Sequence, residues 1–391
     1  MTAAMVAPVR DTAPCPRDEL RAYAASAFDA AAVGAPRSYP LDDELFVGAW
    51  DGWAHDAARV GAAPVLQRSL VQLQFPVAQG MSSRADYQDC TRRGILPPQG
   101  KHAPAHLADP DGVSIHIHPT PAGRLPVIST RHRADFETIV RAVTRRNEPD
   151  LIPPSMGACI VGGYNNWSRV GALRAEWTAR QRGMGRDDSP ESWAQEFRRI
   201  MPQRELYQDR FVILSAGPYS GTRGADVGVD DDAWLRLSYR IRLEHECAHY
   251  FTRRVFGSMR NSLLDELVAD YTGIVSARGR FEPAWLLRFM GVEGERFRSE
   301  GRLVNYRGTP PLGDDAFLML QQLVRSAART LDDFDTMLRG GEAPRRGPRT
   351  VDETASSITV IAGIGLEALT EPGAGTALYA AYRRCADASR A

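Results

Sequence analysis

The sequence predicts an α+β fold in which a short mixed sheet lies between mainly helical segments. From residue 17 to about residue 94, apolar residues recur at three- and four-residue spacing, which is the period of an amphipathic helix. Strand-like alternation follows between residues 113 and 130, and most of the later chain returns to the helical period. With 391 residues, 43% of them apolar and 25% charged, the chain can bury its own core, which excludes disorder and a disulfide scaffold.

Composition changes divide the chain into three predicted parts. Residues 1–16 contain three prolines and few large apolar side chains, as expected of a disordered tail. Residues 17–110 form a helical N-terminal region that ends in a stretch rich in proline and glycine, typical of a linker or long loop. Residues 111–391 form the main domain, with a helical C-terminal part.

Three segments of this main domain predict strands. VSIHIHP at 113–119 alternates in polarity, PAG supplies a turn, and LPVIST at 125–130 is its expected hairpin partner. FVILSAG at 211–217 predicts a third strand, and residues 133–146 predict an amphipathic helix between them. We interpret the stretch at 152–170, which is rich in proline, glycine and asparagine, as irregular.

Charge and cysteine content exclude several classes of protein. The chain has 48 basic and 48 acidic residues, so it lacks the basic excess typical of a nucleic-acid-binding protein. Its five cysteines show no C-x-x-C spacing, which argues against a thiolate zinc site and a disulfide framework. The N-terminus has no apolar signal region, and no apolar run reaches the roughly 20 residues needed to span a bilayer. We therefore expect a cytoplasmic protein with no nucleic-acid or membrane partner.

The most informative motif is HECAH at residues 245–249, inside a long predicted helix that begins at the acidic cluster 230–232 and ends near Gly257. Residues four apart on a helix face the same way, so both imidazoles can bind one metal ion. Glu246 would lie beside that ion and could accept a proton from a metal-bound water.

A second helix, predicted at 261–277, supplies further groups. Glu266 lies 17 residues beyond His249 and shares a helical face with Asp270. If a turn folds this helix back against the first, Glu266 can be a third metal ligand, and Asp270 can accept the N–H of His245 and so fix its tautomer. Asp265, next to Glu266, remains an alternative third ligand.

Residues 245–271 resemble the zincin metallohydrolases, and among them the gluzincins with a thermolysin-like site. The resemblance implies Zn²⁺ bound by His245, His249 and Glu266, with Glu246 as the general base and Asp270 as the orienting aspartate. It also implies a zincin-like core within 111–391, with the sheet above the helix at 232–256. No histidine follows His249, so a transition-state donor from that side must be a tyrosine, an arginine or an asparagine.

Two segments are candidates for contacts with the substrate or the transition state. After Gly162 and Gly163 come Tyr164, Asn165, Asn166 and Trp167, which together could form a polar pocket wall. The strand at 211–217 could be the sheet edge that receives an extended substrate, which would place Tyr219 near the metal. An ordinary turn and an ordinary strand are the alternative interpretations.

His116 and His118 would point to the same face of the first strand, and such a pair can bind a metal. Because no carboxylate triad lies nearby in the sequence, we interpret them as ordinary strand residues.

The predicted function is zinc-dependent hydrolysis of a peptide or small amide by a metal-activated water. One alternative is a small-molecule metalloenzyme of specialised metabolism, such as an amidase, deacylase or lyase. Another is an inactive binding protein stabilised by its metal.

Overall fold

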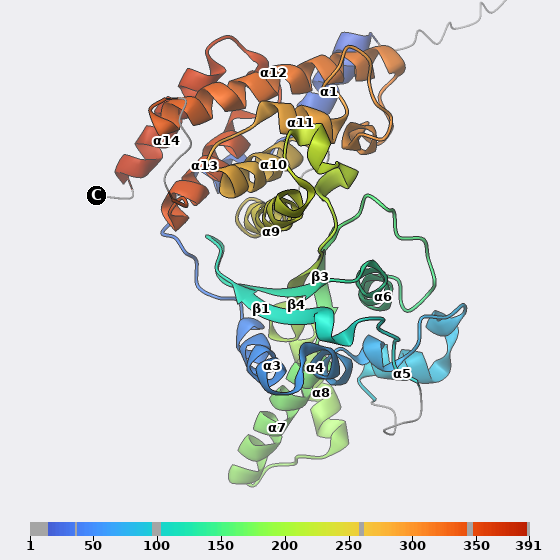
Figure 1. The fold of residues 1–391 in the computed structure, drawn as a ribbon. Helices are drawn as coiled ribbons and strands as arrows, with labels where there is room; N and C mark the ends of the chain where they lie inside the picture. Colours follow the sequence, from blue (N-terminus) through green and yellow to red (C-terminus); the bar gives the residue numbers. More distant parts are fainter. Residues whose placement is uncertain (1–14, 36, 96–102, 258–261, 342–346, 389–391) are drawn as a thin grey trace, which may run out of the picture.

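The computed structural model describes residues 15–35, 37–95, 103–257, 262–341 and 347–388. The predicted tail at 1–16 lies outside these residues except for its last two positions. The α+β class and the mixed sheet are both confirmed (Figure 1).

The sheet has four strands in the order β1-β2-β4-β3. They are β1 (Val113–His118), β2 (Leu125–Thr130), β3 (Ala158–Asn165) and β4 (Gln208–Ser215). β1 and β2 form the predicted antiparallel hairpin, β2 and β4 are parallel, and β3 is antiparallel to β4.

One prediction about the sheet is wrong. The strand predicted at 211–217 is β4, which lies inside the sheet, so it cannot offer a free edge to a substrate. The two edge strands are β1 and β3, and β3 lies in the segment that we predicted to be irregular. Its short apolar run, Ala158 to Val161, is followed by two glycines, and Gly163 adopts a φ of +78° at a register shift. The bulge explains why strand periodicity was not visible in the sequence.

Helices cover both faces of the sheet (Figure 1). The upper layer contains α1 (Pro16–Ala24), α2 (Ala30–Gly34), α9 (Asp231–Val255), α10 (Leu263–Arg278), α11 (Pro283–Met290), α12 (Asp314–Arg339), α13 (Val351–Ile364) and α14 (Ala374–Ala388). The lower layer contains α3 (Val47–Val60), α4 (Ala62–Ser69), α5 (Ala85–Arg93) and α6 (Arg133–Thr144), while α7 (Trp167–Gly183) and α8 (Pro190–Ile200) project below it.

Successive side chains of β4 point to opposite faces of the sheet and so contribute to both layers. Val212 and Leu214 belong to the core that the sheet shares with α9, whereas Phe211 and Ile213 point into the lower core with α3 and α6. This period of two is what a strand buried on both faces requires.

Residues 17–110 are mainly helical where the structure describes them, but they do not pack as one unit. Phe28, close after α1, contacts Phe256 at the end of α9, with ring centroids 5.6 Å apart. Trp50 of α3 instead lies against Phe211 under the sheet, with centroids 4.8 Å apart. The N-terminal region therefore contributes to both cores.

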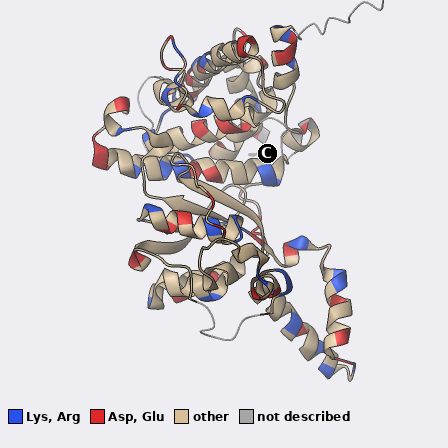
Figure 2. Cartoon of the chain, turned by 90° about the vertical axis from the view of Figure 1, so that its right-hand side faces the viewer, with Lys and Arg blue, Asp and Glu red and all other residues tan. Residues whose placement is uncertain are grey.

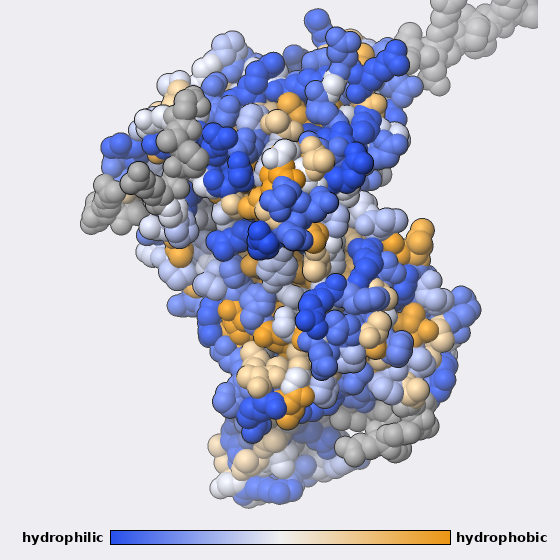
Figure 3. All heavy atoms as spheres, viewed as in Figure 1, coloured by the Kyte–Doolittle hydropathy of each residue, from blue (hydrophilic) through white to orange (hydrophobic). Residues whose placement is uncertain are grey.

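Charges of both signs are interspersed over the helices (Figure 2). On the face shown in Figure 3, apolar residues form small scattered groups among polar ones. Within the described residues, no helix combines the length and apolar character needed to cross a membrane.

The pair α9 and α10 forms the centre of the upper layer. The Asp230 side chain accepts the Ala233 N–H at 2.9 Å and caps α9, as the acidic cluster predicted. Where the helices meet, Gly273 of α10 approaches the backbone of α9 so closely that a Cβ there would lie 2.6 Å from the Ile241 carbonyl oxygen. Only glycine allows this separation.

Candidate metal centre

His245, His249 and Glu266 meet in the interface between α9 and α10. Their exposed fractions are 5%, 5% and 9%, so all three are buried. The two histidines come from adjacent turns of α9, and Glu266 comes from the first turn of α10. The predicted fold-back of the second helix brings them together.

The spacing of their donor atoms fits a tetrahedral ion. The two Nε2 atoms are 3.1 Å apart, His249 Nε2 is 3.2 Å from one Glu266 oxygen, and His245 Nε2 is 3.5 Å from the other. Ligands held about 2.0–2.1 Å from a tetrahedral zinc are about 3.3 Å from one another. One donor atom from each residue lies within 4.8 Å of the other two.

The remaining ring nitrogens are held by carboxylates. His245 Nδ1 is 3.0 Å from Asp270 Oδ1, and His249 Nδ1 is 2.8 Å from Asp265 Oδ2. When each Nδ1–H donates to its carboxylate, the Nε2 lone pair is left for a metal. Asp265 also accepts a hydrogen bond from the Thr252 hydroxyl at 2.7 Å. The structure thus places Glu266 among the convergent donors and Asp265 behind His249.

A tyrosine and an arginine complete the arrangement. The Tyr219 hydroxyl donates to Asp270 Oδ1 at 2.7 Å and lies 2.9 Å from His245 Nδ1. Arg302 donates to Glu266 Oε2 at 3.3 Å and also to Asp270, and its guanidinium lies 5.2 Å from the centre of the Tyr219 ring. The structure thus places Tyr219, a predicted candidate for contact with the substrate or the transition state, on the Nδ1 side of His245 and not beside the convergent Nε2 donors.

Sequence reasoning missed Arg302. It lies 36 residues beyond Glu266, in the short 3₁₀ segment Arg302–Tyr306, among many other arginines. No local spacing separates it from them.

The electrostatics of the centre favour an added cation. Burial raises the pKa of Asp270, but Arg302 and His245 outweigh it, and the pKa is lowered. Burial likewise opposes ionisation of Glu266, yet His249, His245 and Arg302 bring its pKa below the usual range. The pKa of His249 would fall through burial, but Asp265 and Glu266 raise it well above its ordinary value.

These shifts describe a buried excess of negative charge. With neutral histidines, Glu266, Asp265 and Asp270 supply three negative charges and Arg302 one positive charge, a net charge of minus two. Buried charge of this kind must be neutralised. A divalent cation supplies the two positive charges that neutralise it. The donor set and its charge both fit zinc.

Glu246 lies on the side of α9 toward the sheet. It is half-buried and close enough to Cys159 of β3 and to Arg242, one turn earlier, to interact with both electrostatically. Burial lowers the pKa of Arg242 to about 10, and its guanidinium donates to the Ser215 carbonyl at 2.7 Å. The structure thus places Glu246 beside edge strand β3.

The other predicted contact residues, 164–167, lie at the end of β3 and the start of α7, and the structure does not bring them to the metal centre. Each side chain is hydrogen-bonded within the protein. Tyr164 donates to Gln72 at 2.8 Å, Asn165 accepts from Gln208 at 3.0 Å, Asn166 donates to buried Asp209 at 2.6 Å, and Trp167 donates to the Thr91 carbonyl at 3.0 Å. Asn166 also caps α7. Buried polar groups need hydrogen-bond partners, and the partners found here connect the start of α7 to the lower layer.

Comparison with known proteins identifies the family of the chain but gives no activity. No curated protein and no solved structure matches the chain. A family model matches residues 11–372, which is most of the sequence. The chain therefore belongs to DUF7005, a family of unknown function.

Proposed function

We propose that this protein is a zinc-dependent hydrolase acting on a peptide or amide bond. The observation that carries the proposal is the convergence of two Nε2 atoms and one carboxylate at 3.1–3.5 Å in a buried interface. The carboxylates on both Nδ1 atoms support it, because they orient the imidazoles toward a common point.

Each residue has a distinct task in this proposal. Bound zinc supplies Lewis acidity and a water that is more acidic than bulk water. With that ion bound, Glu246 would be the base that accepts a proton from the attacking water, and it would transfer this proton to the leaving amine. Asp265 and Asp270 keep the Nδ1 protons in place, and Arg302 limits the negative charge that gathers around Glu266.

The surrounding architecture is consistent with a zincin-like core. The helix that carries the motif lies directly against a mixed sheet, and β3 forms the edge of that sheet next to Glu246. An edge strand has unpaired backbone groups that an extended acyl or peptide segment can pair with. This favours a substrate with a peptide-like backbone over a compact metabolite.

The test is the variant Glu246→Gln, which keeps the shape of the side chain and removes the base. We expect it to retain zinc and its melting temperature and to lose on the order of 10²–10⁴-fold in turnover. Wild type is first screened against short peptides and acylated amino acids, and each hydrolysed compound is then assayed with the variant. Glu176→Gln is the matched control, because Glu176 is an exposed glutamate of α7 and should leave turnover unchanged.

Turnover near the wild-type rate in Glu246→Gln would refute water activation by this residue. A protein that binds zinc but hydrolyses none of the compounds screened would instead favour the inactive binding protein. Hydrolysis of acylated amino acids but not of peptides would favour the small-molecule enzyme.

A further inference from the structure

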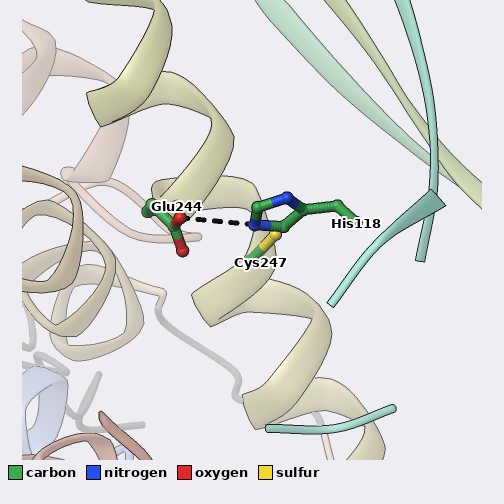
Figure 4. A group of neighbouring side chains, drawn as sticks. All are labelled: His118, Glu244 and Cys247. Atoms are coloured by element: carbon green, nitrogen blue, oxygen red, sulfur yellow. Dashed lines mark ion pairs between the residues drawn. The ribbon is translucent and has the colours of Figure 1, made fainter. Parts of the chain in front are cut away.

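We propose a second metal site on α9, formed by His118, Glu244 and Cys247. One donor atom from each of these residues lies within 4.8 Å of the other two. His118 Nε2 is 3.3 Å from a Glu244 oxygen. Figure 4 shows the imidazole extending from the end of β1 toward both the carboxylate and the sulfur.

This site is separate from the metal centre. Glu244 and Cys247 are three residues apart and share one face of α9. At 100° per residue, that face is turned roughly 150° from the one that carries His245 and His249. The two sites therefore lie on opposite sides of one helix, and neither shares a ligand with the other.

The donor set indicates which ions the second site would bind. Imidazole, carboxylate and thiolate together suit a borderline-soft ion such as Zn²⁺, whereas Mg²⁺ and Ca²⁺ require oxygen ligands. Cys247 is 3% exposed, so its sulfur is shielded from solvent on the helix side. The sequence alone did not identify the partners of His118, because Glu244 and Cys247 lie more than 120 residues away and meet it only in the folded chain.

An entry path is present. His118 and Glu244 line a cavity of about 790 Å³, together with Arg240 and Ser276. An ion can reach His118 and Glu244 from this cavity, and the Cys247 sulfur lies within 4.8 Å of their donor atoms. The fourth position of the ion would face the cavity and hold water or a small ligand.

One neighbour competes with the ion. Arg240 Nε is 3.4 Å from the same Glu244 oxygen and donates to the Ser276 hydroxyl at 2.8 Å. Binding must displace part of this contact, so the second site should be weaker than the metal centre. An ion there would link the end of β1 to α9 and so join the sheet to the upper layer.

The experiment is a cobalt titration of chelator-stripped protein. Cobalt bound to a thiolate gives a near-ultraviolet charge-transfer band, and none of the three donors at the metal centre is sulfur. In wild type we expect two equivalents to bind, with the thiolate band growing during the second. We also expect the second equivalent to raise the melting temperature.

Variants assign the band to this site. His118→Gln and Cys247→Ser should each lose the band and the second equivalent, and His118→Gln replaces a partly exposed residue, so folding is not at risk. His116→Gln is the matched control, since His116 lies on the same strand with its ring centroid 6.3 Å from that of His118 and is not one of the three donors. Arg240→Gln should tighten binding of the second equivalent.

The proposal fails if wild type shows no thiolate band, or if the band survives in Cys247→Ser. It also fails if His116→Gln and His118→Gln titrate alike. His245→Ala separates this result from the proposed function, because it should lose the first equivalent and keep the thiolate band.

Discussion

Replacing Gly273 by alanine tests whether close packing of α9 and α10 builds the metal centre. A Cβ at this position would lie 2.6 Å from the Ile241 carbonyl oxygen and 3.1 Å from the Ile241 side chain. A carbon–oxygen contact relaxes at about 3.3 Å, so the backbones must separate locally by about 0.7 Å. Gly273 lies two turns beyond Glu266, on the same face of α10, so the displacement should tilt the helix that carries Glu266, the proposed third ligand.

The size of both effects can be worked from this geometry. Metal sites tolerate ligand displacements of about 0.2 Å, so zinc binding should weaken even if only part of the helix separation of about 0.7 Å reaches Glu266. Loss of a group that orients a ligand typically weakens metal binding by about 10–100-fold, and we expect an effect of this size. Overpacking costs about 1–3 kcal/mol, and alanine returns about 1 kcal/mol of helix propensity. We therefore expect a net loss of about 0–2 kcal/mol in the free energy of unfolding.

The assay combines competitive zinc titration against a chromophoric chelator with denaturant unfolding of the metal-free protein. Gly171→Ala is the matched control, because Gly171 is inside α7 and a Cβ there meets nothing within 4 Å. It should bind zinc normally and gain up to about 1 kcal/mol in stability. If Gly273→Ala behaves like Gly171→Ala in both measurements, the contact at Ile241 does not set the helix separation.

Two further predictions concern the groups around the ligands. Asp270→Asn should weaken zinc binding by about 10–100-fold in the same competition assay, because the neutral amide no longer fixes the His245 tautomer and no longer balances the charge of Arg302. Unchanged affinity would show that His245 is oriented by Tyr219 alone. The pKa of His249 is raised in the metal-free protein, so its contribution to stability is fully present below pH 6.5 and is lost as the pH rises through the raised pKa. Zinc must displace that proton, so the affinity for zinc should increase as the pH rises from about 6.5. Calorimetry in buffers of different ionisation enthalpy should detect the released proton, and an affinity that does not change with pH over that range would contradict the raised pKa of His249.

Local spacing was sufficient to predict the core of the site. The four-residue interval between His245 and His249 and the shared face of Glu266 and Asp270 depend only on helix geometry, and α9 and α10 begin and end within about two residues of the predicted bounds wherever those are described. The hairpin of β1 and β2 was visible for the same reason, since strand alternation and the turn residues lie next to each other in the sequence.

What the sequence did not reveal depends on contacts between distant segments. Sequence spacing did not decide between Asp265 and Glu266 as the third ligand. Only the packing of α10 against α9 shows that Asp265 is hydrogen-bonded to His249 Nδ1. Arg302 and the partners of His118 are likewise brought in by packing. Residues 164–167 were misleading, because amides and aromatics that satisfy a buried carboxylate, here Asp209, look in sequence like those of a binding pocket.

The most direct test of the central claim is the zinc content of the purified protein. Elemental analysis after exhaustive dialysis without chelator should find tightly bound zinc in wild type. His245→Ala and Glu266→Gln should each contain one equivalent less than wild type, while His116→Gln matches wild type. Wild-type protein from zinc-supplemented cells that contains no zinc, or a His245→Ala variant that retains the full wild-type content, would contradict a metal centre formed by His245, His249 and Glu266.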